Sequence, residues 1–255
     1  SVILCPEDID IQKINSNSTL ILVRNPRLWF MKCIKKFVSA PLASSISKDY
    51  HTLNSIIKST NIGDNTSIGN FCVIEKNVEI GNNCMIYPGV QIYDRTKIGN
   101  NVTIFPSVII GSAIFGPQRE KSMKLETCTH LAGVHIGDDV EIGSNTSILP
   151  GFLKDTKIGD GTKISSQVYI GSAMQIGKNC MITGKTYFGG SSILEDNVYI
   201  GPGANIRNGI TVSKNSFVGL GSVVVKNVKQ NTTVMGVPAK SVNHNSDTNA
   251  LNNIL

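Results

Sequence analysis

A large aliphatic residue, most often isoleucine, returns at every sixth position along most of this chain. The count runs without a gap from Ile56 to Ile110, resumes over 136–148, and after a slip continues by six from Ile158 to Val224. A spacing of six fits neither the 3.6-residue helical turn nor a heptad, so a helix would scatter these residues around its surface. The pattern predicts a parallel β-helix whose coils stack ~4.8 Å apart with the aliphatic residues inward.

Two further positions of the six-residue unit have preferences of their own. Glycine follows the aliphatic residue in 13 of the 25 units, which predicts a cramped or positive-φ backbone at a corner of the coil. The fourth residue after the aliphatic one is usually small, and three of the six cysteines stand there: Cys72, Cys84 and Cys180. Because no CxxC or paired spacing occurs, we interpret these thiols as buried fillers rather than ligands or disulfides.

Two insertions interrupt the repeat. Residues 112–131 form an insertion of 20 residues, and four extra residues lie within 148–157. An irregular loop in an otherwise regular solenoid often serves binding. A strap between the subunits of a trimer explains the insertions equally well, and the sequence does not separate the two.

The first 50 residues lack the repeat and predict a small α/β domain. Residues 18–38 predict a buried strand, a turn at Asn25-Pro26 and an amphipathic helix. The side chains expected to face mostly inward on this helix are Leu28, Met31, Cys33, Ile34 and Phe37, with Lys32, Lys35 and Lys36 on the other face. The predicted domains are 1–50, the β-helix over 51–240, and a polar tail over 241–255.

Composition and charge narrow the class of protein. Charged residues make up 16% of the 255 residues, and the 24 glycines suit short strands joined by tight turns. A net charge of +6 with a pI near 9.0 suits either an acidic partner or merely a soluble basic surface. No apolar run approaches the ~20 residues of a membrane span, and no signal peptide opens the chain. We therefore expect a cytoplasmic protein with no stable membrane insertion and no nucleic-acid partner.

The repeat, an aliphatic residue followed by glycine, two variable residues, a small residue and one more, resembles that of the hexapeptide-repeat acyltransferases. This resemblance implies an all-β fold, a left-handed parallel β-helix shaped as a three-sided prism and assembled as a homotrimer. With three units per coil, the 25 units make about eight coils.

Three segments are similar to particular branches of that family. "GVHIGDDVEIGSNTSI", preceded by "IFGP", resembles the UDP-3-O-acylglucosamine N-acyltransferases of lipid A synthesis, and "LILVRNPRLWFMKCIKKF" resembles the end of their nucleotide-binding domain. "VGLGSVVVKNVKQNTTVMGVPAKSV" is similar to the last coil of sugar acetyltransferases that use acetyl-CoA. Ser165 and Ser172, however, stand where the lipid A enzymes carry an aspartate and a histidine.

The resemblance therefore implies an N-acyltransferase acting on a dTDP- or UDP-linked amino sugar for surface polysaccharide or lipopolysaccharide. The acyl donor would be acyl-CoA, either acetyl-CoA or a short 3-hydroxyacyl-CoA, and no metal is expected. Two alternatives stay open: an acyl-carrier-protein-dependent enzyme of the lipid A type, and a non-catalytic hexapeptide scaffold.

Acyl transfer from a thioester to an amine needs a neutral amine, a polarised carbonyl and an acceptor for a proton. Since correct positioning alone contributes ~7–11 kcal/mol, a dedicated base is helpful rather than obligatory. The candidate catalytic residues are His130, at the end of the long insertion, and Ser172, with ordinary solvation or packing as the alternative for both. His135 is expected to point outward, where a neighbouring subunit would lie, and His51 and His244 are expected on the surface.

Candidate binding residues stand at the two ends of the chain. Near the C-terminus, backbone groups beside glycines and two lysine side chains are expected to contact CoA: Gly201, Gly219, Gly221, Lys226 and Lys240. The alternative is that these glycines are simply corners of the coil. Near the N-terminus, Asn25 and Trp29 are the candidates for nucleotide binding, with Trp29 stacking on the base unless it belongs to the domain core.

Overall fold

The computed structural model describes residues 2–9, 19–37, 54–127 and 129–242. The chain divides into two units, one formed by residues 1–47 with 245–255 and the other by residues 48–244. No helix within the described ranges has the length and hydropathy needed to cross a membrane.

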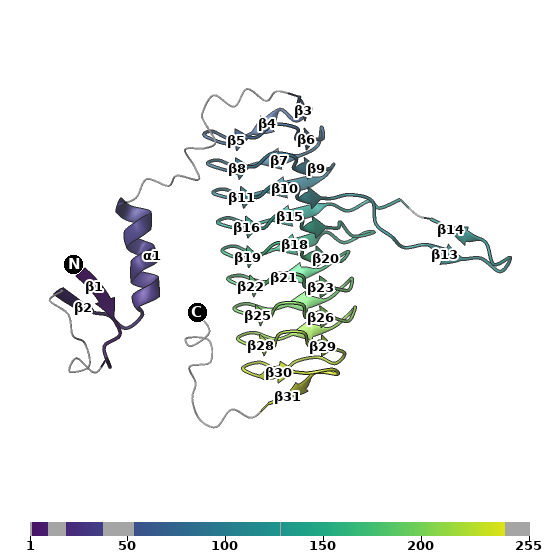
Figure 1. Cartoon of the computed structure of the whole chain (residues 1–255). Helices are drawn as coiled ribbons and strands as arrows, with labels where there is room; N and C mark the ends of the chain where they lie inside the picture. The colour runs from purple at the N-terminus through teal and green to yellow at the C-terminus, as the bar shows by residue number, and fades with distance from the viewer. Residues whose placement is uncertain (1, 10–18, 38–53, 128, 243–255) are drawn as a thin grey trace. The chain divides into compact units, whose positions relative to one another are not determined.

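The N-terminal unit pairs two short parallel strands, β1 (Val2–Cys5) and β2 (Thr19–Leu22), and continues into helix α1 (Pro26–Phe37) (Figure 1). Asn25 caps the helix, because its Oδ1 accepts a hydrogen bond from the Leu28 N–H at 2.9 Å. The predicted order of strand, turn and helix is confirmed. The predicted burial is wrong: β2 is mostly exposed, and so is every described side chain of α1 from residue 27 onward.

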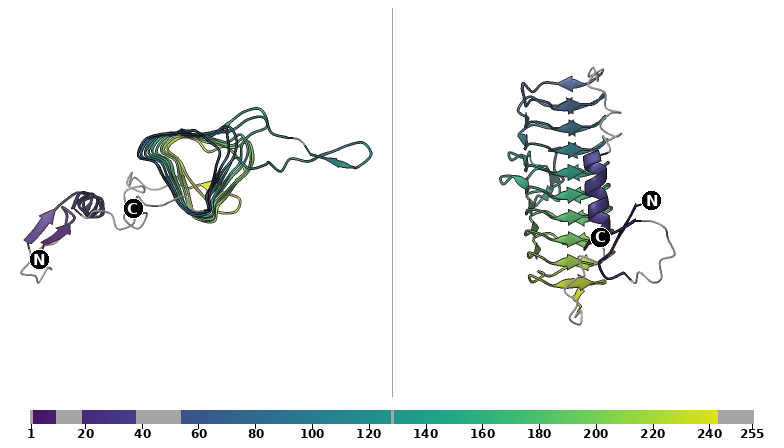
Figure 2. Two further views of the ribbon diagram at one scale, coloured as in Figure 1. Left: turned by 90° about the horizontal axis from the view of Figure 1, so that it is seen from above. Right: turned by 90° about the vertical axis from the view of Figure 1, so that its left-hand side faces the viewer.

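The second unit is a three-faced parallel solenoid, and its cross-section is triangular when viewed along the axis (Figure 2). The first face has eight strands: β4 (Asn61–Ile62), β7 (Glu79–Ile80), β10 (Thr96–Ile98), β15 (Val134–Ile136), β18 (Thr156–Ile158), β21 (Gln175–Ile176), β24 (Ile193–Leu194) and β27 (Thr211–Val212). The second face has ten: β5 (Ser67–Ile68), β8 (Met85–Ile86), β11 (Thr103–Ile104), β16 (Glu141–Ile142), β19 (Lys163–Ile164), β22 (Met181–Ile182), β25 (Tyr199–Ile200), β28 (Phe217–Val218), β30 (Thr233–Met235) and the antiparallel β31 (Lys240–Ser241). The third face has nine: β3 (Ile56–Ile57), β6 (Val73–Ile74), β9 (Gln91–Ile92), β12 (Ile109–Ile110), β17 (Ser147–Ile148), β20 (Tyr169–Ile170), β23 (Tyr187–Phe188), β26 (Asn205–Ile206) and β29 (Val223–Val224).

The register confirms three six-residue units per coil. Ile62 pairs with Ile80 in the next coil, 18 residues along, and this step recurs down the stack. It lengthens to 38 residues between Ile98 and Ile136 and to 22 between Ile136 and Ile158, which accommodates the two insertions. The eight strands of the first face mark eight complete coils, as predicted.

At the start of the solenoid, the prediction that Ile56 is an inward repeat residue is wrong. Ile57, and not Ile56, pairs with the inward Ile74, and Ile56 is 55% exposed. From Ile68 onward the repeat residues form one continuous buried column. Cys72, Cys84 and Cys180 are buried beside them as free thiols, which confirms their interpretation as fillers of the interior.

The glycines after the repeat residue are needed because successive coils approach closely. A Cβ added at Gly81 would lie 2.6 Å from the carbonyl oxygen of Gly99 in the next coil. Positive φ is found instead mostly two residues later, where asparagine is frequent, as at Asn83 with φ 56° and Asn101 with φ 57°. The sequence predicted either a cramped backbone or a positive φ at these glycines. The cramped backbone is the reason at Gly81, whereas Gly111 has both a close neighbour and a positive φ of +81°.

The long insertion carries a small hairpin. Strands β13 (Gln118–Arg119) and β14 (Leu125–Glu126) pair antiparallel, and the hairpin projects outward from the prism (Figures 1 and 2). We call residues 112–131 the arm. Its tip exposes apolar side chains, among them Met123 at 65%.

Candidate functional site

Both insertions leave the solenoid at the same edge and in successive coils. The arm begins after β12 and returns at β15, and the short insertion begins after β17 and returns at β18. The Leu131 N–H donates to the Phe152 carbonyl at 2.8 Å, and the Thr156 N–H donates to the Gly133 carbonyl at 3.2 Å. The bases of the two loops are therefore joined side by side at the edge of the first face.

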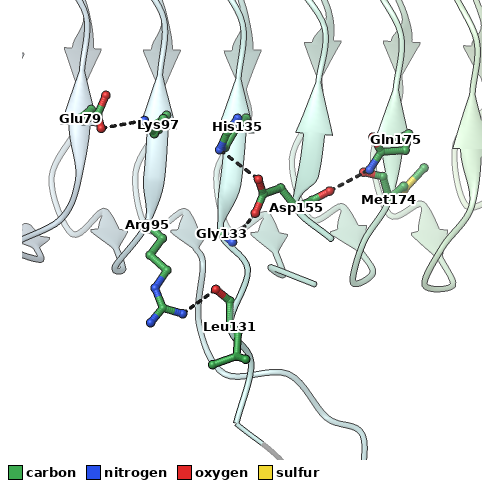
Figure 3. A network of polar contacts seen from close by, with 9 residues as sticks. All are labelled: Glu79, Arg95, Lys97, Leu131, Gly133, His135, Asp155, Met174 and Gln175. Atoms are coloured by element: carbon green, nitrogen blue, oxygen red, sulfur yellow. Dashed lines mark hydrogen bonds and ion pairs between the residues drawn. The ribbon is translucent and has the colours of Figure 1, made fainter. Parts of the chain in front are cut away.

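A histidine and an aspartate meet beneath these loops. His135 lies outward on β15, and its Nε2 is 3.2 Å from a carboxylate oxygen of Asp155, which comes from the short insertion (Figure 3). The other carboxylate oxygen accepts the Gly133 N–H at 2.7 Å. Asp155 is thus held by backbone on one side while it orients the imidazole on the other. Both side chains stay partly exposed, at 39% and 32%.

Positive charge flanks the pair along the same face. In register, Lys97 of β10 and Lys157 of β18 stand directly on either side of His135. Lys97 forms an ion pair with Glu79 at 2.8 Å, whereas Lys157 forms none within the described ranges. Two coils beyond His135, Gln175 donates a hydrogen bond to the Asp155 carbonyl at 2.8 Å, which braces the short insertion.

An open groove of about 660 Å³ on the first face is lined by residues that include Lys97, His135, Lys157 and Gln175. Further along it, Lys178 pairs with Asp160 at 2.8 Å; this contact raises the pKa of Lys178 and lowers that of Asp160. The groove thus joins one oriented imidazole to ammonium groups on either side. Such a set suits proton transfer at a substrate that carries phosphate.

The predicted catalytic residues lie elsewhere along this edge. His130 is half-buried at the end of the arm, and Ser172 is half-buried at the coil corner that follows β20. Neither lines the groove. Both remain untested predictions, and His51 and His244 lie outside the described residues.

The predicted CoA contacts lie in the last coils of the solenoid. A Cβ at Gly201 would lie 2.6 Å from the Leu220 nitrogen, and one at Gly219 would lie 2.8 Å from the Met235 Cβ, so coil packing already accounts for both glycines. Gly221 differs, because it has φ +62° and nothing within 4 Å of an added Cβ. Contacts of these glycines, Lys226 and Lys240 with CoA stay predictions.

In the N-terminal unit, the side chain of Asn25 is engaged in capping α1. Trp29 is 48% exposed, and the Lys32 ammonium lies 5.2 Å from its ring centroid. The alternative that Trp29 belongs to a domain core is therefore wrong for this unit. Its stacking on a nucleotide base stays a prediction.

The sequence placed His135 outward but did not connect it with Asp155. These residues are 20 positions apart, and the connection depends on how the two insertions fold at their common edge. A usable signal existed, because both insertions interrupt the repeat just before a strand of the same face. Residues at the end of one insertion then become neighbours of residues at the end of the other.

Family models match two parts of the solenoid. The model for "Bacterial transferase hexapeptide (six repeats)" matches residues 59–94, and that for "Hexapeptide repeat of succinyl-transferase" matches residues 133–172. The chain is a hexapeptide-repeat β-helix protein. No curated protein matches its sequence.

Solved structures of the same hexapeptide-repeat fold superpose on most of the chain. LpxA from Acinetobacter baumannii is 22% identical with a TM-score of 0.66, covering 74% of this chain and 72% of its own. The UDP-N-acetylglucosamine acyltransferase from Campylobacter jejuni is 23% identical, with the same TM-score and coverage. A further UDP-N-acetylglucosamine acyltransferase is 25% identical with a TM-score of 0.66, covering 74% of this chain and 71% of its own.

Proposed function

We propose that this hexapeptide-repeat protein is an acyltransferase that moves an acyl group from a thioester to a nucleotide-linked sugar, with His135 as general base. The observation that carries the proposal is the His135–Asp155 pair in a lysine-flanked groove where the two insertions meet. Its fold is shared with solved UDP-N-acetylglucosamine acyltransferases, which supports the class of substrate. The phosphates of a nucleotide sugar suit the ammonium groups of Lys97 and Lys157.

The reaction needs one proton to leave the nucleophile. As the sugar nitrogen or oxygen attacks the thioester carbon, His135 accepts its proton and Asp155 stabilises the resulting imidazolium. The tetrahedral intermediate then collapses by breaking the C–S bond. The imidazolium returns the proton to the departing thiolate, so that an amide or ester and a free thiol leave the enzyme. Asp155 acts through the orientation of the imidazole and is a positioning residue.

The finer identity of both substrates belongs to the same proposal. The donor is acyl-CoA, acetyl or short 3-hydroxyacyl, held toward the last coils near Gly221, Lys226 and Lys240, and the acceptor is the amine of a dTDP- or UDP-linked amino sugar. A homotrimer would place a neighbouring subunit against the open groove. A hydroxyl acceptor is the second candidate, since a similarly folded solved structure, 22% identical with a TM-score of 0.56, is described as a UDP-N-acetylglucosamine O-acyltransferase.

The test measures thiol release from acetyl-CoA, 3-hydroxybutyryl-CoA and acyl carrier protein thioesters with UDP- and dTDP-linked sugars that carry a free amine or only hydroxyls. We expect release only when donor and acceptor are both present. His135→Asn should lower kcat by about 10²–10⁴-fold, the usual contribution of a general base. Asp155→Asn should lower it less and shift the acidic limb of the pH profile.

His130→Asn is the matched control, because it removes the other histidine at this edge. This variant should retain activity. If His130→Asn lost much more activity than His135→Asn, the role of general base would pass to His130. If no combination of donor and acceptor released thiol, while calorimetry showed binding of a sugar nucleotide, the result would instead support the non-catalytic scaffold. Activity with the carrier-protein donor alone would support the lipid A type of enzyme.

A further inference from the structure

Helix α1 exposes its apolar side chains without cover from the described part of its own unit. Trp29, Phe30 and Ile34 are 48%, 58% and 42% exposed, and no described side chain of the helix is buried. Exposed apolar surface of this kind usually marks a site of interaction. We propose that α1 docks in the surface of an anionic lipid membrane, lying in the plane of the headgroups.

Most of the large apolar residues share one side of the helix. At ~100° per residue, Trp29, Phe30, Cys33 and Ile34 fall within an arc of about 140°, whereas Leu28 and Met31, 45% and 58% exposed, lie on the other side among the lysines. Arg27 and Lys36 border this arc, and the remaining lysines lie opposite it. A helix of 12 residues is only ~18 Å long, too short to span the ~30 Å core of a bilayer, so it lies in the interface.

Charge decides which partner fits this surface. Residues 19–37 contain five basic residues and no acidic one, so this segment carries +5 of the net charge of +6 and leaves only +1 for all other residues. A basic face beside an aromatic and aliphatic stripe is the combination that binds anionic headgroups and inserts shallowly. A second copy of α1 would bring another +5 against the first, which repels it.

Trp29 makes the proposal directly measurable, because it is the only tryptophan of the chain. The full-length protein is mixed with vesicles of phosphatidylglycerol and phosphatidylcholine, or of phosphatidylcholine alone, while Trp29 fluorescence is recorded. We expect a blue shift with the anionic vesicles, which 0.5 M salt reverses, and none with the neutral vesicles. Co-sedimentation with the vesicles reports the bound fraction independently.

Two variants keep the reporter and separate charge from apolar contact. Arg24→Gln with Lys32→Gln should weaken vesicle partitioning about fivefold per charge removed, and Phe30→Ser should weaken it at unchanged charge. Lys185→Gln with Lys214→Gln is the control, because it removes the same charge from exposed positions of the solenoid and should leave partitioning unchanged. Circular dichroism confirms that each variant folds.

Several results would overturn the proposal. Equal binding to neutral vesicles would show that charge plays no part, and equal weakening by the control variant would show that α1 is not the contact. A Trp29 spectrum that is already blue-shifted and unchanged by vesicles would show that protein covers the helix. Quenching of Trp29 by UDP with no response to vesicles would assign the surface to the nucleotide. None of these readouts depends on acyl transfer.

Discussion

Replacing Thr96 by valine tests how the solenoid tolerates polar atoms in its interior. Thr96 is completely buried on β10, and its Oγ1 has no hydrogen-bond partner within the described residues. Its register neighbour in the next coil, Val134, already places a valine in the same column. Because a buried hydroxyl without a partner costs about 1–3 kcal/mol, we expect Thr96→Val to raise the free energy of unfolding by that amount. The melting temperature should rise by about 2–4 °C for each kcal/mol.

Thr156 offers a matched control in the same column, next to Val134 on the other side. It is equally buried, but its Oγ1 donates to the Leu149 carbonyl at 2.6 Å. Thr156→Val should therefore lower stability by about 1 kcal/mol or more, since the carbonyl loses its donor. Differential scanning calorimetry of both variants shows whether each substitution raises or lowers the melting temperature. A lower melting temperature for Thr96→Val would mean that its hydroxyl is satisfied after all and would refute the reasoning.

Two further predictions concern the core. Burial raises the pKa of the Cys180 thiol to about 11 from the ordinary 9.0. The contribution of this group to the free energy of unfolding is therefore complete below pH 9 and falls as the pH rises from 9 toward 11. The total loss is roughly 2–3 kcal/mol. Urea unfolding between pH 9 and 11 should show this decline in the free energy of unfolding, and the decline should be less steep in Cys180→Ala. An equal decline with pH in the two proteins would contradict the raised pKa of Cys180. Phe188 is fully buried on β23, while its neighbour Tyr187 is 48% exposed. Phe188→Ala should therefore lower the free energy of unfolding by about 3–5 kcal/mol, and Tyr187→Ser by about 1 kcal/mol or less. Similar urea midpoints for the two variants would refute this orientation of the strand.

The solenoid was predictable because each coil repeats the same local problem. An inward aliphatic residue is needed at every sixth position, and a glycine at the closest approach of two coils and a small fourth residue recur in many of the units. The error at Ile56 falls on β3, the end strand of its sheet among the described residues, where Ile57 pairs with the inward Ile74 instead. On α1 the helix was predicted correctly and the burial was wrong, since a helical pattern of apolar residues does not state what covers them.

By itself, the sequence determined the spacing of the strands, most of the inward residues and the positions of both insertions, since each depends on neighbours within about one coil; three units per coil was implied by the family resemblance. Only the tertiary structure decided which outward residues meet. His135 and Asp155 become partners because two insertions of unequal length leave the same edge in successive coils. That contact depends on how irregular loops pack together, and no periodicity in the chain encodes it.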